Sequence, residues 1–142
     1  MEERCTVYPG DNRVVCPRGV ADRVNLGLLP TAEMSFKTAC LALKPKTGGT
    51  LHIHGNVRTE KNFVKVRKSL SNVMESATFR CDNNSWRSWC IVTGNMIAEI
   101  FSEINLTSGW IIQLIHLERV KSFAPHVDHL VLDVKCCPDL TF

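Results

Sequence analysis

The chain has 142 residues, of which 44% are hydrophobic and 22% charged, so it fits a single globular domain and is too apolar to be disordered throughout. Its net charge of +3 permits nucleic-acid binding without requiring it, because nucleic-acid domains usually carry a denser basic patch. No apolar run approaches the roughly 18 residues that a membrane helix needs, and the N-terminal residues lack the apolar stretch of a secretory signal.

The cysteine pattern bears on the compartment and on metal binding. Seven cysteines lie at positions 5, 16, 40, 81, 90, 136 and 137. The number is odd and no secretory signal is expected, so we predict reduced thiols in a cytoplasmic protein. No two cysteines have the Cys-x-x-Cys spacing that commonly holds zinc. The sequence therefore predicts no metal site.

The first part of the chain alternates strand and helix signals. In chain order we expect a short strand at residues 4–8, a turn at 9–12, a strand within 18–30, a helix over 31–45 and a short strand at 50–54. Thr31 is the predicted N-cap of the helix, and Pro45 ends it. The residues at helical spacing, which we expect in the core, are Ala32, Phe36, Ala39, Cys40 and Leu43.

The second part predicts helices followed by a strand pair. Residues 60–103 are mostly helical in pattern, with a loop at 81–85, and strands follow at 110–120 and 127–136. The connection at 121–126 is too short for a parallel crossover, so these strands must be antiparallel. Alternating strands and helices predict an α/β fold with a largely parallel sheet. No Gly-x-Gly-x-x-Gly follows a first strand, so the usual phosphate-binding turn is missing from the pattern.

Four segments carry a resemblance to a known family. They read GDNR at 10–13, ADRVNLGLLP at 21–30, GTLHIH at 49–54 and VKSFAPHVDHLVLDV at 120–134. In this order, the segments resemble the tRNA wybutosine-synthesizing protein 2 family. The resemblance implies the C-terminal half of a class I S-adenosylmethionine-dependent methyltransferase-like (Rossmann-like) domain with an antiparallel last strand pair. Residues 1–142 would then form a partial domain that lacks the N-terminal strands and the glycine-rich motif.

The strand order of this class, 3-2-1-4-5-7-6, adds two expectations. Residues 4–8 would be the third strand without its neighbours, and the strand that contains Asn25 would become an open edge. An unpaired apolar edge invites association with another chain. We therefore expect the 142-residue chain alone to be poorly soluble, oligomeric or only partly folded.

The resemblance also implies an activity. Family members transfer the 3-amino-3-carboxypropyl group of S-adenosyl-L-methionine, their co-substrate, to the modified guanosine next to the anticodon of tRNA-Phe. In this chain the activity would need parts upstream of Met1, and no catalytic residue is assigned. A tRNA guanine N1-methyltransferase of the sister family is an alternative, which the long motif at residues 25–30 disfavours. A non-catalytic fragment or isoform is another alternative.

Three residues are implied cofactor contacts. At the end of the third strand the Asp11 carboxylate would accept a hydrogen bond from the adenine amino group, and Asn12 would bond the ring edge. The alternative is a plain turn, because Gly, Asp and Asn all favour turns. Asn25 would hold the reacting end of the cofactor or the target base. Its alternative is one polar residue at the end of a buried strand.

The implied tRNA-binding residues are Pro30, which ends the Asn25 motif, and Lys121 and His126 in the last connection. Lys121 would pair with a tRNA phosphate, and His126 or Phe123 would stack on a base. An ordinary solvated hairpin is the alternative. His52 and His54 share one strand face, but spacing supplies no third metal ligand. His54 lies nearer the carboxyl end of its strand, where ligands gather in α/β sheets, so a substrate-side role stays open.

Overall fold

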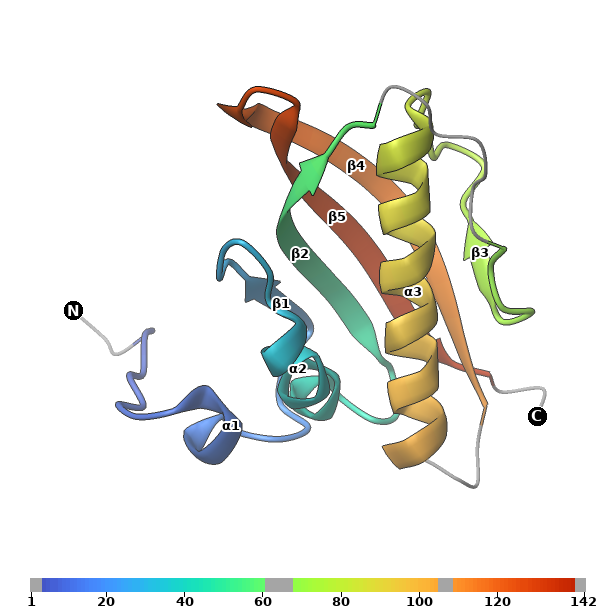
Figure 1. The fold of residues 1–142 in the computed structure, drawn as a ribbon. Helices are drawn as coiled ribbons and strands as arrows, with labels where there is room; N and C mark the ends of the chain where they lie inside the picture. Colours follow the sequence, from blue (N-terminus) through green and yellow to red (C-terminus); the bar gives the residue numbers. More distant parts are fainter. Residues whose placement is uncertain (1–3, 61–67, 105–108, 140–142) are drawn as a thin grey trace.

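The computed structural model describes residues 4–60, 68–104 and 109–139. It is a two-layer α/β fold, in which α2 (Phe36–Ala42) and α3 (Asn84–Ile104) lie on one face of a five-stranded sheet (Figure 1). Two short helical segments, α1 (Asn12–Val15) and η1 (Glu33–Ser35), precede α2. No helix within the described ranges is long and apolar enough to cross a bilayer.

The sheet has the strand order β1-β2-β5-β4-β3. Its strands are β1 (Arg23–Leu26), β2 (Gly49–Arg58), β3 (Val73–Glu75), β4 (Trp110–Ala124) and β5 (Val127–Pro138). The pairs β1–β2 and β3–β4 are parallel, and β5 lies antiparallel between β2 and β4. The predicted antiparallel pair is confirmed, and β1-β2-β5-β4 is the 4-5-7-6 part of the expected order. The predicted fold class is therefore confirmed.

The core fills the space between the helices and one sheet face. On β2 and β5 every second residue is buried, as the two-residue period of a strand requires. Beneath the helices, Phe101 of α3 stacks on Trp110 with ring centroids 4.1 Å apart. The five residues expected in the core at helical spacing are all buried: Ala32, Phe36, Ala39, Cys40 and Leu43. Their burial against the sheet explains why this segment is helical.

The N-terminal expectations are corrected in two places. Residues 4–8 are not a strand; they are exposed and have no secondary structure. Strand propensity alone does not form a strand where no neighbouring backbone supplies hydrogen bonds. The strand predicted within residues 18–30 is only β1, because the preceding backbone bonds to the end of α2 instead: the amides of Gly19 and Val20 donate to Leu41 and Ala42.

The second half also differs from its prediction. Residues 61–67, part of the expected helical stretch, lie outside the described residues. The following stretch contains β3, which pairs with β4, and residues 81–83 lead into α3 rather than linking two helices. The β4–β5 connection is a two-residue turn, because β4 continues through Lys121 to Ala124. The sequence pattern predicted β4 too short, because the last residues of the strand are mostly exposed and show no alternation of buried and exposed positions.

The sheet begins at β1, so the strand that contains Asn25 is an edge, as predicted. Exposed apolar residues lie close to it in the chain, among them Val20 and Leu28, with relative exposures of 60% and 57%. We expect the 142-residue chain to self-associate through this edge. Size-exclusion chromatography with light scattering over a range of concentrations tests this. A monomer at every concentration would contradict it.

Two glycines with the same backbone conformation provide a matched test of packing at the start of β2. Gly48 and Gly19 have φ values of +70° and +69°, but a Cβ at Gly48 would overlap the Cys136 carbonyl oxygen, whereas one at Gly19 would meet only Pro45 Cδ at 3.5 Å. We expect Gly19→Ala to lower the free energy of unfolding by about 1–2 kcal/mol. Gly48→Ala adds a steric cost of about 1–3 kcal/mol.

Urea unfolding of the two variants beside the parent chain measures this difference. Equal losses for the two substitutions would mean that the Cys136 backbone moves freely away from β2.

Candidate functional site

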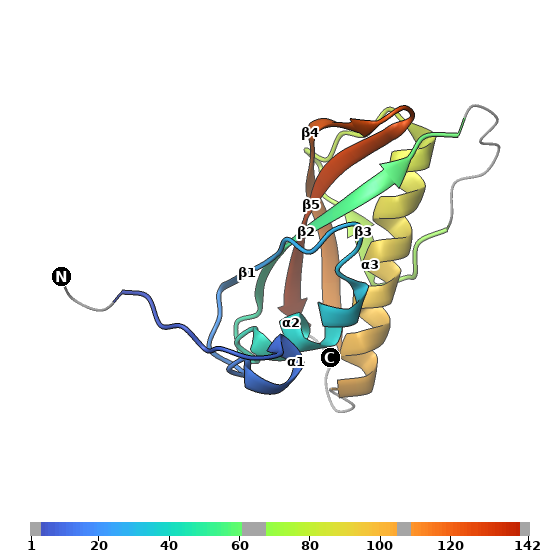
Figure 2. The ribbon, with the colours of Figure 1, turned by 60° about the vertical axis from the view of Figure 1, so that its left-hand side comes forward.

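A cavity of about 240 Å³ lies at the carboxyl end of β1, where ligands gather in α/β sheets. The segments around it are α1, β1 with its following loop, and η1 with α2, which lie together in Figures 1 and 2. Its polar lining residues are Asn12, Asn25, Ser35 and Thr38. The remaining lining residues are small or apolar: Cys16, Val24, Leu26, Gly27, Leu28, Ala32 and Ala39.

Asp11 and Asn12 occupy different positions relative to this cavity. Asp11 is the N-cap of α1: its Oδ1 accepts a hydrogen bond from the Arg13 amide at 2.9 Å. Its carboxylate also pairs with the Arg13 guanidinium at 2.7 Å. The hydrogen bonds from Arg13 lower the pKa of Asp11 to about 2. Asn12 lines the cavity, and its Oδ1 accepts a hydrogen bond from Ser35 Oγ at 3.2 Å.

Asn25 reaches the cavity from β1. Its Oδ1 lies 3.0 Å from His54 Nε2, across the parallel β1–β2 pair. Its Nδ2 lies near Gly27, where an added Cβ would be 3.5 Å away. The structure thus brings Asn12 and Asn25 to one cavity from segments that are distant in sequence. Asp11 is not among the residues that line it, and its adenine contact stays a prediction.

The other predicted site residues lie outside the cavity lining. Pro30 is exposed, and its carbonyl accepts a hydrogen bond from the Asn56 amide at 3.0 Å, which fixes the loop after β1 to β2. Lys121 is exposed on β4, and His126 is in the β4–β5 turn with φ 61°. The His126 carbonyl accepts a hydrogen bond from the Thr59 amide at 2.7 Å. The turn is therefore anchored to the end of β2.

Histidines and charged residues lie on the sheet face opposite the helices. His52 Nδ1 is 2.7 Å from Asp133 Oδ1, and His54 Nδ1 is 2.9 Å from His129 Nε2. Burial, with smaller contributions from His129 and His52, lowers the pKa of His54. Across residues 4–60, 68–104 and 109–139, no group of three His, Cys, Asp or Glu side chains is arranged to hold a metal ion.

Sequence reasoning missed the cavity contribution of Ser35 and the contact of His54 with Asn25. Ser35 follows the predicted N-cap without any motif of its own, and nothing in its spacing points to Asn12. His54 carried a partial signal, because it lies toward the carboxyl end of its strand. Its partner could not be read from the sequence, since 29 residues separate it from Asn25.

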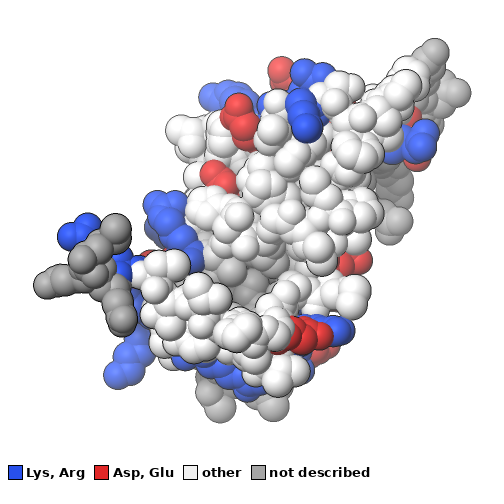
Figure 3. Space-filling view, turned by 90° about the vertical axis from the view of Figure 1, so that its left-hand side faces the viewer, with Lys and Arg blue, Asp and Glu red and all other residues white. Residues whose placement is uncertain are grey.

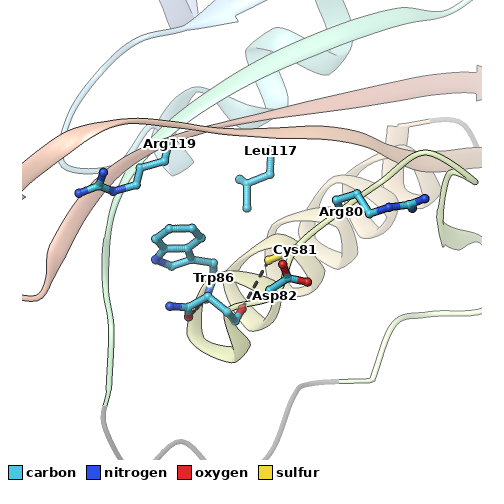
Figure 4. A pocket seen from close by; sticks show the side chains of 7 residues that line it. Arg80, Cys81, Asp82, Trp86, Leu117 and Arg119 are labelled. Atoms are coloured by element: carbon cyan, nitrogen blue, oxygen red, sulfur yellow. Dashed lines mark hydrogen bonds between the residues drawn. The ribbon is translucent and has the colours of Figure 1, made fainter.

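A second hollow, of about 380 Å³, lies between the start of α3 and β4 (Figure 4). It is lined by Arg80, Cys81, Asp82, Asn83, Trp86, Leu117 and Arg119. Cys81 is a free thiol like the other six cysteines. A hydrogen bond from the Cys90 thiol is the main cause that lowers the pKa of Cys81 to about 7, against the opposing effect of burial.

Charge is sparse on the face that Figure 3 presents. Basic side chains lie along the top, the left and the bottom of this view, around a broad surface without charge. The loop after β1 contributes exposed apolar residues, Leu28 and Leu29, with Met34 following in η1. Among the side chains that the structure describes, this view shows no dense basic patch.

The lowered pKa of Cys81 predicts its reactivity. Because the thiolate is the nucleophile, alkylation of Cys81 by iodoacetamide should increase steeply from about pH 6 to pH 8. Cys40 is the internal control, because burial raises its pKa to about 12, and it should stay unmodified. Peptide mass spectrometry follows each cysteine separately.

Replacing Cys90 by alanine removes the hydrogen bond that stabilises the Cys81 thiolate. The pKa of Cys81 should then rise, so its alkylation near pH 7 should slow by several-fold. The same alkylation profile with and without the Cys90 thiol would show that another group controls Cys81.

The chain is similar to proteins of one named family. It is 37% identical over 145 residues to the "tRNA wybutosine-synthesizing protein 2 homolog" of Danio rerio, covering 97% of this chain and 35% of that protein. It is 39% identical over 138 residues to the "tRNA wybutosine-synthesizing protein 2/3/4" of Arabidopsis thaliana, covering 96% and 11%. The chain thus spans about a third or less of these relatives. No protein-family model matches it.

A solved structure shares the fold. The crystal structure of M. jannaschii TYW2 in complex with AdoMet superposes with a TM-score of 0.54 at 19% sequence identity, covering 91% of this chain and 44% of that one. At this identity the likeness concerns the fold alone.

Proposed function

Because this chain belongs to the tRNA wybutosine-synthesizing protein 2 family, we propose that it forms part of an S-adenosylmethionine-dependent transferase that modifies tRNA. Its reaction transfers the 3-amino-3-carboxypropyl group to the modified guanosine next to the anticodon of tRNA-Phe. The observation that carries the proposal is the single cavity at the carboxyl end of β1, which Asn12 and Asn25 both line.

The composition of the cavity fits part of such a cofactor. Side-chain amides at Asn12 and Asn25 offer donors and acceptors, and apolar residues such as Val24 and Leu26 surround them. Its volume of about 240 Å³ is below the roughly 300–1,000 Å³ of typical ligand pockets. The cavity therefore accommodates one end of the cofactor, and residues beyond this lining would hold the rest.

The chemistry assigns these residues a role in binding and orientation. When bound, S-adenosylmethionine supplies a carbon made electrophilic by its cationic sulfur. Catalysis then depends mainly on positioning. Asn12, fixed by Ser35, and Asn25, fixed by His54, provide two oriented amides. Orientation of the cofactor tail decides which carbon faces the base, and this separates aminocarboxypropyl transfer from methyl transfer.

The proposed partner is the anticodon loop of tRNA-Phe, in the cytoplasm. Lys121 and His126 are exposed near the β4–β5 turn, and Phe123 beside them has a relative exposure of 61%. A cation and aromatic rings on one hairpin match the phosphate contacts and base stacking by which proteins bind unpaired RNA. The turn adjoins the end of β2 through the Thr59–His126 hydrogen bond, at the carboxyl end of that strand.

A chimera tests the proposal. The matching segment of about 145 residues in the Danio rerio relative is replaced by this chain, and labelled S-adenosylmethionine is supplied with tRNA-Phe that carries the modified guanosine. We expect the aminocarboxypropyl label in the tRNA, identified by mass spectrometry of the nucleosides. Asn12→Ala and Asn25→Ala should each weaken cofactor binding by about 1–3 kcal/mol, the cost of an unmade buried hydrogen bond.

Asn84→Ala is the matched control, because Asn84 is exposed at the start of α3 and does not line the cavity. Transfer of a methyl label instead would favour the sister methyltransferase. A folded chimera that transfers neither group would contradict the proposal.

A further inference from the structure

Two chains of side-chain hydrogen bonds cross strands β1, β2 and β5 on the sheet face opposite the helices. The first joins Arg23, His52 and Asp133, and the second joins Asn25, His54 and His129. Each chain takes one residue from each of the three strands. Only the second chain ends at a residue that lines the cavity.

The first chain has an unambiguous direction. A guanidinium only donates hydrogen bonds, so His52 Nε2, 3.3 Å from Arg23 Nη1, must accept. His52 Nδ1 then carries the proton and donates to Asp133 Oδ1 at 2.7 Å. This row of hydrogen bonds fixes the ring of His52 without reaching Asn25. A substitution of His52 is therefore an internal control for a substitution of His54.

The second chain determines which end of the Asn25 amide faces the cavity. Asn25 Oδ1 only accepts, so His54 Nε2 at 3.0 Å must carry a proton. In a neutral His54 ring, Nδ1 is then the acceptor, and His129 Nε2 at 2.9 Å donates to it. The Asn25 oxygen is thereby engaged on the β2 side. Its Nδ2 is left on the side of Gly27, and Gly27 lines the cavity.

We propose that His54, supported by His129, is a positioning residue that fixes the Asn25 carboxamide with its N–H donors toward the cavity. The group that this end of the cavity takes is therefore a hydrogen-bond acceptor, such as a carboxylate or a ring nitrogen. The role of His54 adds detail to the proposed function, and only the identity of the ligand, S-adenosylmethionine, rests on that proposed function. The orientation of Asn25 itself is independent of any activity.

The surroundings of His54 keep its ring neutral. The groups that face it are His52 on its own strand, His129 and Asp133 on β5, and Asn25 on β1. Burial is the largest effect and lowers the pKa of His54 below its usual value of 6.5. The folded chain then binds fewer protons here than the unfolded chain does. Stability contributed by this site is present at neutral pH and falls as the pH drops below about 6.5.

Nuclear magnetic resonance of the 142-residue chain, at a concentration where light scattering shows a monomer, tests the orientation without a ligand. Long-range nitrogen–proton spectra of the imidazoles should show the Nε2–H tautomer for His54 and the Nδ1–H tautomer for His52 at neutral pH. The side-chain amide signals of Asn25 should shift in His54→Ala and stay in place in His52→Ala. A neutral His54 ring with its proton on Nδ1, or Asn25 amide signals that do not shift in His54→Ala, would overturn the proposal.

A double-mutant cycle in the chimera tests the consequence for binding. His54→Ala should weaken S-adenosylmethionine binding by about tenfold and lower the rate of transfer at saturating tRNA. His54→Gln should restore much of both, because its side-chain amide can donate to Asn25 Oδ1. In Asn25→Ala, adding His54→Ala should have little further effect, because coupled neighbours are not additive.

The outcomes separate the two proposals. Independent, additive effects of Asn25→Ala and His54→Ala, or no rescue by His54→Gln, would show that His54 is merely structural. If the parent chimera transfers nothing, the proposed function fails, and the tautomer and amide signals of the chain alone still decide the role of His54.

Discussion

The pairing of β5 with β2 organises this molecule. It runs without a break from Gly49 opposite Cys136 to Arg58 opposite Val127. Because β5 also pairs with β4, the last strand of the chain joins the β1–β2 unit to the β4–β3 unit. Removing it would leave two separate parallel pairs, neither of which is stable alone in water. The helices pack over the continuous sheet that forms when β5 pairs between β2 and β4.

The same pairing sorts side chains onto two faces of opposite character. The residues of β2 and β5 beneath the helices are apolar and fully buried, as Leu51, Ile53 and Leu132 show. The alternate residues, among them His52 and His54, face the other way and meet their partners on β5. A period of two therefore accounts for both the core and the polar network. The register of the β2–β5 pair therefore fixes the core and the polar network together. A slip by one residue would move the apolar residues to the open face and the polar residues beneath the helices.

The sequence predicted those features that depend on local pattern. The helical spacing from Ala32 to Leu43 marked a buried face, and the short link after β4 required an antiparallel partner. Failures occurred where the outcome depends on distant backbone. Residues 4–8 have strand propensity and no neighbour to pair with, whereas Val73–Glu75 is too short for periodicity and becomes a strand by pairing with β4.

The candidate site divides in the same way. Asn12 and Asn25 were assigned through the family resemblance, and their meeting at one cavity required the fold. Ser35 and His54 were not linked to them, because a hydrogen bond between residues 23 or 29 positions apart leaves no trace in local spacing. Asp11 differs, because both of its contacts are local: it caps α1 through the Arg13 amide and forms an ion pair with the Arg13 guanidinium.

The chain of bonds through Asn25, His54 and His129 has a further consequence. His54 accepts a hydrogen bond from His129 and donates one to Asn25, so the three groups share a single direction of hydrogen bonding. Reversing the Asn25 carboxamide requires both imidazoles to exchange the nitrogen that carries the proton. The amide is thus one end of a two-state unit that spans three strands. The orientation of the Asn25 amide and the tautomers of His54 and His129 change together or not at all.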